Sequence, residues 1–224
     1  MRNALRYSSI LIVFACLSCA TVGLEQLRPP RVMSDKLPRL EPAIDVASLE
    51  AAFAVSQAHA LGTVNRTGVV SMSGSTVRDR RVRDYVTLYE RDVLDNICES
   101  AGDVYGRMEF RITGGEARKK IWLQIPSGLS LCLLNLFGMP MGYVVVEMEA
   151  EVRVYDSKNQ VIGRYAASTY QKARVGPYYG ISGPTQRMTA IDAYNAIMKE
   201  IKGEMQKDVA RLRKALLDRG PVGG

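Results

Sequence analysis

Histidine is almost missing from this chain of 224 residues, because His59 is the only one. Ser-His-Asp and Cys-His catalysis each need a histidine beside the nucleophile, so both would depend on this one side chain. The sequence also lacks a Gly-x-Ser-x-Gly elbow, a Walker phosphate loop and a His-Glu-x-x-His zinc motif. We therefore expect a non-enzymatic protein without a cofactor, and we rank an unrecognised hydrolase last among the alternatives.

Cysteine is also scarce, with Cys16 and Cys19 near the N-terminus and Cys98 and Cys132 in the region expected to fold. The latter two allow either one disulfide in an exported protein or two separately buried thiols. Four convergent soft ligands are not available, so no metal site is expected.

Long apolar runs are absent as well. The uncharged stretch 9–17 follows Arg2 and Arg6 and is much shorter than the roughly 20 residues that a membrane-spanning helix needs. A short apolar run behind a basic N-terminus is typical of a secretory signal peptide that is removed after export. We expect that peptide to comprise residues 1–18, which makes a permanent transmembrane anchor the less favoured alternative.

The apolar stretch ends in residues 17–20, Leu-Ser-Cys-Ala, which resemble the lipobox of bacterial lipoproteins. The resemblance implies that Cys19 becomes the lipidated N-terminus of the mature protein. Cys16 stands where such lipoboxes usually have leucine, and it is the alternative acceptor. Ala20, in place of aspartate, implies sorting to the outer membrane, with the protein anchored on its periplasmic side.

The charge is only mildly basic, since removal of residues 1–18 would lower the formal net charge from +7 to +5. The basic residues are spread along the chain, without the long Lys/Arg block typical of a nucleic-acid-binding tail. We therefore expect no nucleic-acid partner. The expected partners are a membrane, through the lipid anchor, and an envelope protein.

The pattern of prolines and apolar residues divides the mature chain into four parts. Residues 19–43, with four prolines after position 28, predict a lipidated, extended tether. Residues 44–66 predict a short helical extension capped by Asp45. Residues 67–218 are expected to form one folded domain, and residues 219–224 a flexible tail.

Apolar periodicity within that domain predicts an α+β fold. A spacing of three or four residues indicates helices over 79–100 and 185–217, and strict alternation indicates strands over 67–73, 104–113, 143–156 and 161–172. The predicted order is β-α-β-β-β-α, with helices on one face of a sheet of about four strands. The first two strands should be parallel, and an apolar insertion separates the second strand from the third.

The chain resembles a group of uncharacterised exported bacterial lipoproteins through residues 88–97, 133–140 and 193–201, within a span of about residues 79–217. The order of its elements resembles that of the N-terminal domain of the TolB translocation protein. This likeness concerns topology and implies no catalytic role.

Two segments are unusually apolar or aromatic for loops. Residues 129–141 carry no charge, and residues 176–184 place two tyrosines among glycines and prolines. The first segment is either a short helix packed on the sheet or an exposed surface, and the second either a structural Ω-loop or a binding loop. Our hypothesis is docking to an envelope protein; the alternative is a carrier or sensor of an amphiphile with an apolar pocket near residues 129–141. The candidate interaction residues are Leu133, Leu136, Phe137, Met139, Tyr178 and Tyr179.

Overall fold

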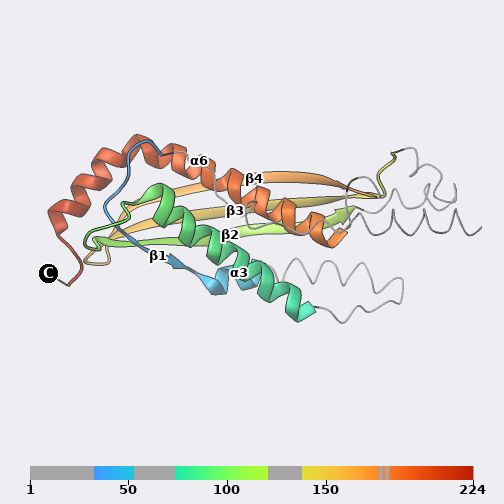
Figure 1. Ribbon diagram of the computed structural model, residues 1–224, viewed down its shortest axis with the longest axis horizontal. Helices are drawn as coiled ribbons and strands as arrows, with labels where there is room; N and C mark the ends of the chain where they lie inside the picture. The colour runs from blue at the N-terminus through green and yellow to red at the C-terminus, as the bar shows by residue number, and fades with distance from the viewer. Residues whose placement is uncertain (1–32, 53–73, 121–137, 177–178, 180–181, 224) are drawn as a thin grey trace, which may run out of the picture.

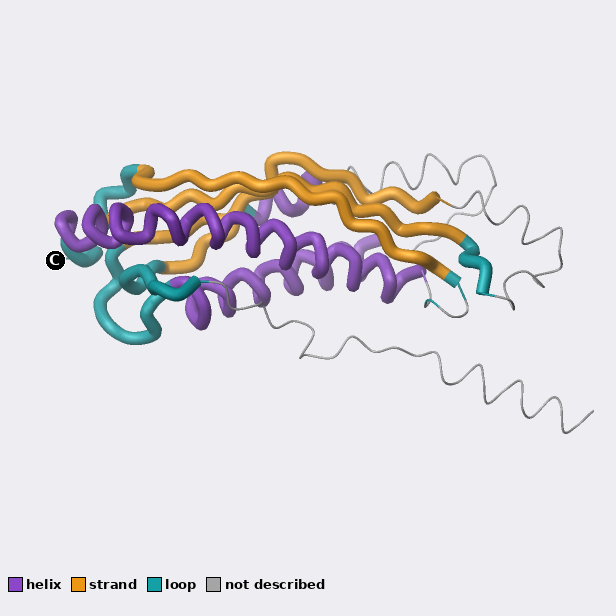
Figure 2. The backbone as a smooth tube through the Cα atoms, turned by 90° about the horizontal axis from the view of Figure 1, so that it is seen from above, coloured by secondary structure: helices purple, strands orange, loops and turns teal. Residues whose placement is uncertain are grey.

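The computed structural model describes residues 33–52, 74–120, 138–176, 179 and 182–223. Its two long helices lie side by side on one face of a twisted sheet (Figures 1 and 2). The elements follow in the order β1 (Glu41–Ile44), α3 (Gly74–Asp92), η2 (Val93–Ile97), β2 (Gly106–Lys120), β3 (Gly142–Asp156), β4 (Val161–Val175) and α6 (Ser182–Arg219). The α+β class and the helical cover are therefore as the sequence predicted.

The sheet has the strand order β1-β2-β3-β4. β1 runs parallel to β2, with Glu41 opposite Arg107, whereas β2, β3 and β4 are antiparallel to one another. A parallel first pair was expected, but residues 41–44, and not the expected 67–73, form the parallel partner of β2. β1 is residues 41–44, and the expected strand at 67–73 lies outside the described residues.

The predicted tether over residues 19–43 is wrong from Met33 onward, because this part of the chain is packed into the domain. Leu37 and Leu40 are buried in the core, and β1 follows them directly. Prolines 38 and 42 favour extended backbone, which suits a tether but equally suits an edge strand, where a missing N–H costs no hydrogen bond. Composition alone does not separate these two outcomes.

Asp45 caps the helical residues 46–52 as predicted, and the cap also closes the edge of the sheet. Its carboxylate accepts the backbone N–H of Ser48 at 3.1 Å, while its own N–H donates to the carbonyl of Phe110. The Ser48 hydroxyl then accepts the N–H of Ile112 at 3.2 Å. Leu49 is fully buried, so this segment belongs to the domain and is not a separate extension.

The three long strands agree with the alternating pattern, with one exception in β2. That strand continues past Thr113 through a β-bulge between Ile112 and Gly114, where the sequence prediction ended. The turn from β3 to β4 is as expected: Asp156 accepts the N–H groups of Lys158 and Gln160, and Asn159 has a φ of 62°.

Aromatic side chains from α3, β2 and α6 form the centre of the core. The rings of Tyr85 and Phe110 each lie within 6 Å of the Tyr194 ring, at 5.6 and 5.7 Å between centroids. The hydroxyl of Tyr85 donates to the carbonyl of Ala190, and that of Tyr89 to the carbonyl of Met108. Tyr85 and Tyr89 are tolerated here because their hydroxyls find backbone acceptors. The buried Tyr194 hydroxyl has no hydrogen-bond partner among the described residues.

A buried ion pair joins the end of α3 to the middle of α6. Lys202 Nζ lies 2.8 Å from Asp92 Oδ1, both residues have no exposed surface, and Asn96 donates to the same oxygen at 2.7 Å. Burial raises the pKa of the Asp92 carboxyl, and Lys202 opposes this rise. The other oxygen, Asp92 Oδ2, has no hydrogen-bond partner among the described residues.

The predicted flexible tail is wrong for its described part. α6 extends to Arg219, and the N–H of Val222 donates to the carbonyl of Val104 at 2.7 Å. The glycines at 220 and 223 adopt positive φ, which lets the chain turn back onto the domain.

We predict that Lys202→Met lowers the free energy of unfolding by about 3–5 kcal/mol, because it leaves the buried Asp92 carboxylate without its cation. The double variant Asp92→Asn/Lys202→Met should recover a large part of this loss. Urea unfolding of the two variants beside the parent measures both values. A single variant as stable as the parent would show that the pair is not desolvated.

Candidate interaction surface

The face of β2, β3 and β4 opposite the two long helices carries the candidate site, and we call it the open face. The other faces of these strands supply the core, for example through Met108, Val152 and Tyr165. Because side chains alternate along a strand, the intervening residues lie on the open face. They are Arg107, Glu109, Arg111 and, after the bulge, Gly114 and Glu116 from β2, Tyr143, Val145, Glu147, Glu149, Glu151, Arg153 and Tyr155 from β3, and Arg164, Ala166, Ser168, Tyr170, Lys172 and Arg174 from β4.

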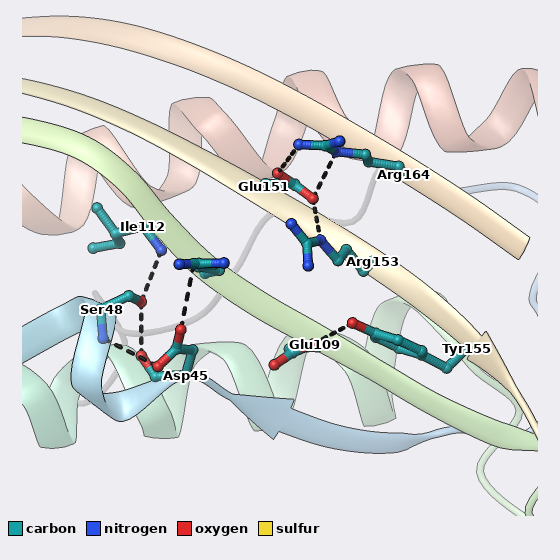
Figure 3. A network of polar contacts seen from close by, with 9 residues as sticks. Asp45, Ser48, Glu109, Ile112, Glu151, Arg153, Tyr155 and Arg164 are labelled. Atoms are coloured by element: carbon teal, nitrogen blue, oxygen red, sulfur yellow. Dashed lines mark hydrogen bonds and ion pairs between the residues drawn. The ribbon is translucent and has the colours of Figure 1, made fainter. Parts of the chain in front are cut away.

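Glu151 lies at the centre of an ion-pair cluster on this face (Figure 3). Its side chain is only 2% exposed, Arg164 reaches both of its oxygens at 2.8 Å, and Arg153 donates to Oε1. Burial alone would raise the pKa of Glu151, but the two arginines outweigh it and hold the pKa below its ordinary value. The carboxylate therefore stays ionised and fixes both guanidinium groups in place.

Three further contacts order the same end of the open face. The guanidinium carbon of Arg107 lies 4.4 Å from the centroid of the Tyr155 ring, and the Tyr155 hydroxyl donates to Glu109 at 2.6 Å. Arg111 forms an ion pair with Asp45 at 3.4 Å. Arginine and tyrosine side chains are thus held by their neighbours before any partner is present (Figure 3).

The opposite end of the sheet joins the two segments that the sequence singled out. The Tyr179 hydroxyl donates to the carbonyl of Gly138 at 2.9 Å, and the N–H of Met141 donates to the carbonyl of Val175 at 2.7 Å. Lys172 and Arg174 lie over tyrosine rings here, at 4.0 Å from Tyr143 and 5.6 Å from Tyr179. Cations and aromatic rings therefore meet beside the ends of the uncharged segment.

Two hollows differ in size and chemistry. An apolar cavity of about 30 Å³ lies between the sheet and the long helices, lined by Tyr85, Met148 and Ala190 among others. A shallow depression of about 320 Å³ lies over β3 and β4, bordered by Glu147, Glu149, Ser168 and Tyr170. The larger hollow is thus open and polar, whereas the apolar one is small.

Few of the predicted site residues can be placed. Met139 is half-buried and Tyr179 is 36% exposed. The following residues lie outside the described residues, so the roles predicted for them stay predictions: Cys16, Cys19, Cys132, Leu133, Leu136, Phe137 and Tyr178.

Cys98 is fully buried beside Leu37, and it has no disulfide partner among the described residues. Burial raises its pKa to about 12, so the thiolate is scarce at neutral pH. A disulfide with Cys132 stays a prediction, since that residue is not described.

In the described part of the chain, no cluster of histidine, cysteine or acidic residues could hold a metal ion. None of the helices described in 33–52, 74–120 and 182–223 is long and apolar enough to cross a membrane.

The sequence did not single out the open-face arginines, because each belongs to an ordinary-looking polar face. Arg153 and Arg164 lie on different strands, and only the β3–β4 register places them opposite one another beside Glu151. One signal was present: residues 161–175 contain basic residues and no acidic residue.

Comparison with known proteins adds no assignment. No protein-family model matches the chain, and no significant match was found among curated proteins.

We predict that Glu151→Gln lowers stability by about 1 kcal/mol near pH 7, because two charge-assisted hydrogen bonds are weakened. The folded pKa of Glu151 lies below its ordinary 4.5, so this stabilisation is full above that pH and is lost as the pH falls through it. The difference between parent and variant should therefore shrink in acid.

Denaturant unfolding between neutral and acidic pH measures the effect. Glu149→Gln is the matched control, since Glu149 lies on the same strand face and has no ion-pair partner among the described residues. A difference for Glu151→Gln that is constant with pH would contradict the assignment.

Proposed function

We propose that this protein is a lipid-anchored, non-enzymatic lipoprotein of the bacterial cell envelope, whose α+β domain docks to an envelope protein. The observation that carries the docking role is the open face, where arginine and tyrosine side chains are held in defined positions. Both residue types are enriched at the energetic centres of protein interfaces. Side chains that are already ordered lose less conformational entropy when a partner binds.

The N-terminal sequence supports the anchor. Arg2 and Arg6, the short apolar stretch and Cys19 follow one another in the order of a lipoprotein signal peptide. Lipidation at Cys19, with Cys16 as the alternative, holds the domain at the outer membrane, facing the periplasm. Several acyl chains on one cysteine give stable anchoring.

A carrier or sensor of an amphiphile is the second candidate, and the cavity beside Tyr85 is the observation in its favour. Its volume of about 30 Å³ compares with roughly 300–1,000 Å³ for typical ligand pockets. Among the described residues this cavity gives an acyl chain little room. Docking through the open face is therefore the better supported role.

We predict that Cys19→Ala moves the protein from the membrane fraction to the soluble fraction of cells and leaves the precursor uncleaved at this site. Loss of the thiol removes the atom that would carry the lipid. Fractionation and intact-mass measurement report both effects, with Cys16→Ala as the matched control. If only Cys16→Ala causes release, the anchor is Cys16; if neither does, the lipoprotein assignment fails.

We predict that Arg107→Glu reduces recovery of the crosslinked envelope partner from intact cells at least tenfold. The substitution reverses a charge on the open face at β2, two strands away from the β4 edge of the sheet. Lys199→Glu, at an exposed position of α6, changes the net charge equally and should leave recovery unchanged. Equal recovery from both variants, with unchanged melting temperatures, would refute docking through the open face.

A further inference from the structure

β4 forms one edge of the sheet, and no described strand pairs with its outer side. Val175 directs its carbonyl toward β3, where it accepts the N–H of Met141. Backbone N–H and C=O groups of successive residues point to opposite sides of an antiparallel strand. Odd-numbered residues of β4 therefore direct these groups toward β3, and even-numbered residues direct them outward. These are Arg164, Ala166, Ser168, Tyr170, Lys172 and Arg174, and all six side chains are exposed.

On the opposite edge of the sheet, neighbouring segments satisfy several backbone groups of β2. There β1 pairs with β2, and Asp45 and Ser48 bond the next backbone groups of Phe110 and Ile112. On the β4 edge, Arg211 satisfies one outward group: it donates a hydrogen bond to the carbonyl of Ile162, at the bulge near the start of the strand. Beyond it, β4 has no proline and continues to Val175, and no described strand pairs with this run of outward groups, which is suited to strand addition.

Charges along this edge follow a definite order. Arg164 belongs to a cluster with Arg153 and Glu151, which carries one net positive charge. Next come Ser168 and Tyr170, whose partners on β3 are Glu149 and Glu147, beside the open depression. Lys172 and Arg174 then restore positive charge, and neither has an ion-pair partner among the described residues. The order is positive, negative, positive.

We infer that the β4 edge binds an extended segment of the partner protein as an added strand, with acidic residues opposite Arg164 and Lys172 and a basic residue opposite Ser168. This inference rests on the proposed docking function and names the partner's chemistry. Ser168 is small, so a lysine or arginine opposite it reaches across to Glu149. Main-chain hydrogen bonds supply affinity in this binding mode, and side chains at alternate positions supply specificity.

A second copy of β4 fits this edge poorly. β4 contains Arg164, Lys172 and Arg174 and no acidic residue, so antiparallel pairing with itself would bring like charges close together. The same basic residues that attract an acidic strand therefore oppose pairing between copies.

Two synthetic peptides of about 11 residues test the inference, a length that covers the free edge at about 3.3 Å per residue. One carries Glu, Lys and Glu at four-residue spacing among threonines and valines, and the other carries Lys, Glu and Lys at the same positions. Binding to the full-length protein in detergent is measured by fluorescence anisotropy. Amide hydrogen exchange of the outward-directed residues is followed in parallel.

The Glu-Lys-Glu peptide should bind at least tenfold more tightly than its charge-exchanged counterpart and slow exchange at the outward amides. Ser168→Pro should abolish binding, because it removes an outward N–H without breaking a bond to β3. Ser168→Thr keeps that N–H and should bind as the parent does. Lys172→Glu should weaken binding of the Glu-Lys-Glu peptide at least tenfold.

Equal binding of both peptides, or full binding to Ser168→Pro, overturns the inference. A dimer of the parent in sedimentation that Ser168→Pro abolishes also overturns it, and assigns the edge to a second copy. Crosslinking in cells separates the two proposals. If Ser168→Pro retains the partner and Arg107→Glu loses it, docking through the open face stands and strand addition fails; if neither loses it, both fail.

Discussion

The buried ion pair between Asp92 and Lys202 fixes how the helices lie on the sheet. A fully buried, charged lysine is costly without a carboxylate beside it, so sliding α6 along α3 would separate Lys202 from Asp92 at a large cost. The π-helical turn η2 begins directly after Asp92 and ends where the N–H of Cys98 donates to the carbonyl of Val93 at 2.8 Å. Leu37 bonds to this turn, and β1 follows, so the position of the first strand depends on the same junction.

Placing both long helices on one face leaves the other face to be stabilised by its own side chains. Glu151 shows how this is done, since its side chain is only 2% exposed and both Arg153 and Arg164 form ion pairs with it. Such a cluster contributes modestly to stability, because the arginines remain in contact with water. Its main effect is to order a charged and aromatic surface, which is the property that a docking surface needs.

The two edges of the sheet differ in how far the described residues satisfy their backbone groups. β1, Asp45 and Ser48 satisfy the backbone groups of β2 over part of one edge, whereas Arg211 satisfies only the start of β4 on the other. Unsatisfied backbone groups at an exposed edge bind water until a strand replaces it. The open face and the β4 edge are continuous, because Arg164, Ser168 and Lys172 belong to both. A partner seated there would meet the backbone and the ordered side chains together.

The sequence by itself determined the α+β class, the long strands, the hairpin turn and the apolar stripe of α6, because alternation and helical spacing report which face of each element is buried. It also carries the argument for export and lipidation, which is local to residues 1–20. Tertiary structure alone decided that residues 33–44 join the sheet, that Asp92 meets Lys202, and that Arg153 and Arg164 enclose Glu151. Each of these depends on which segments become neighbours across the fold, and pairings between residues far apart in the chain leave no periodic signal in one sequence.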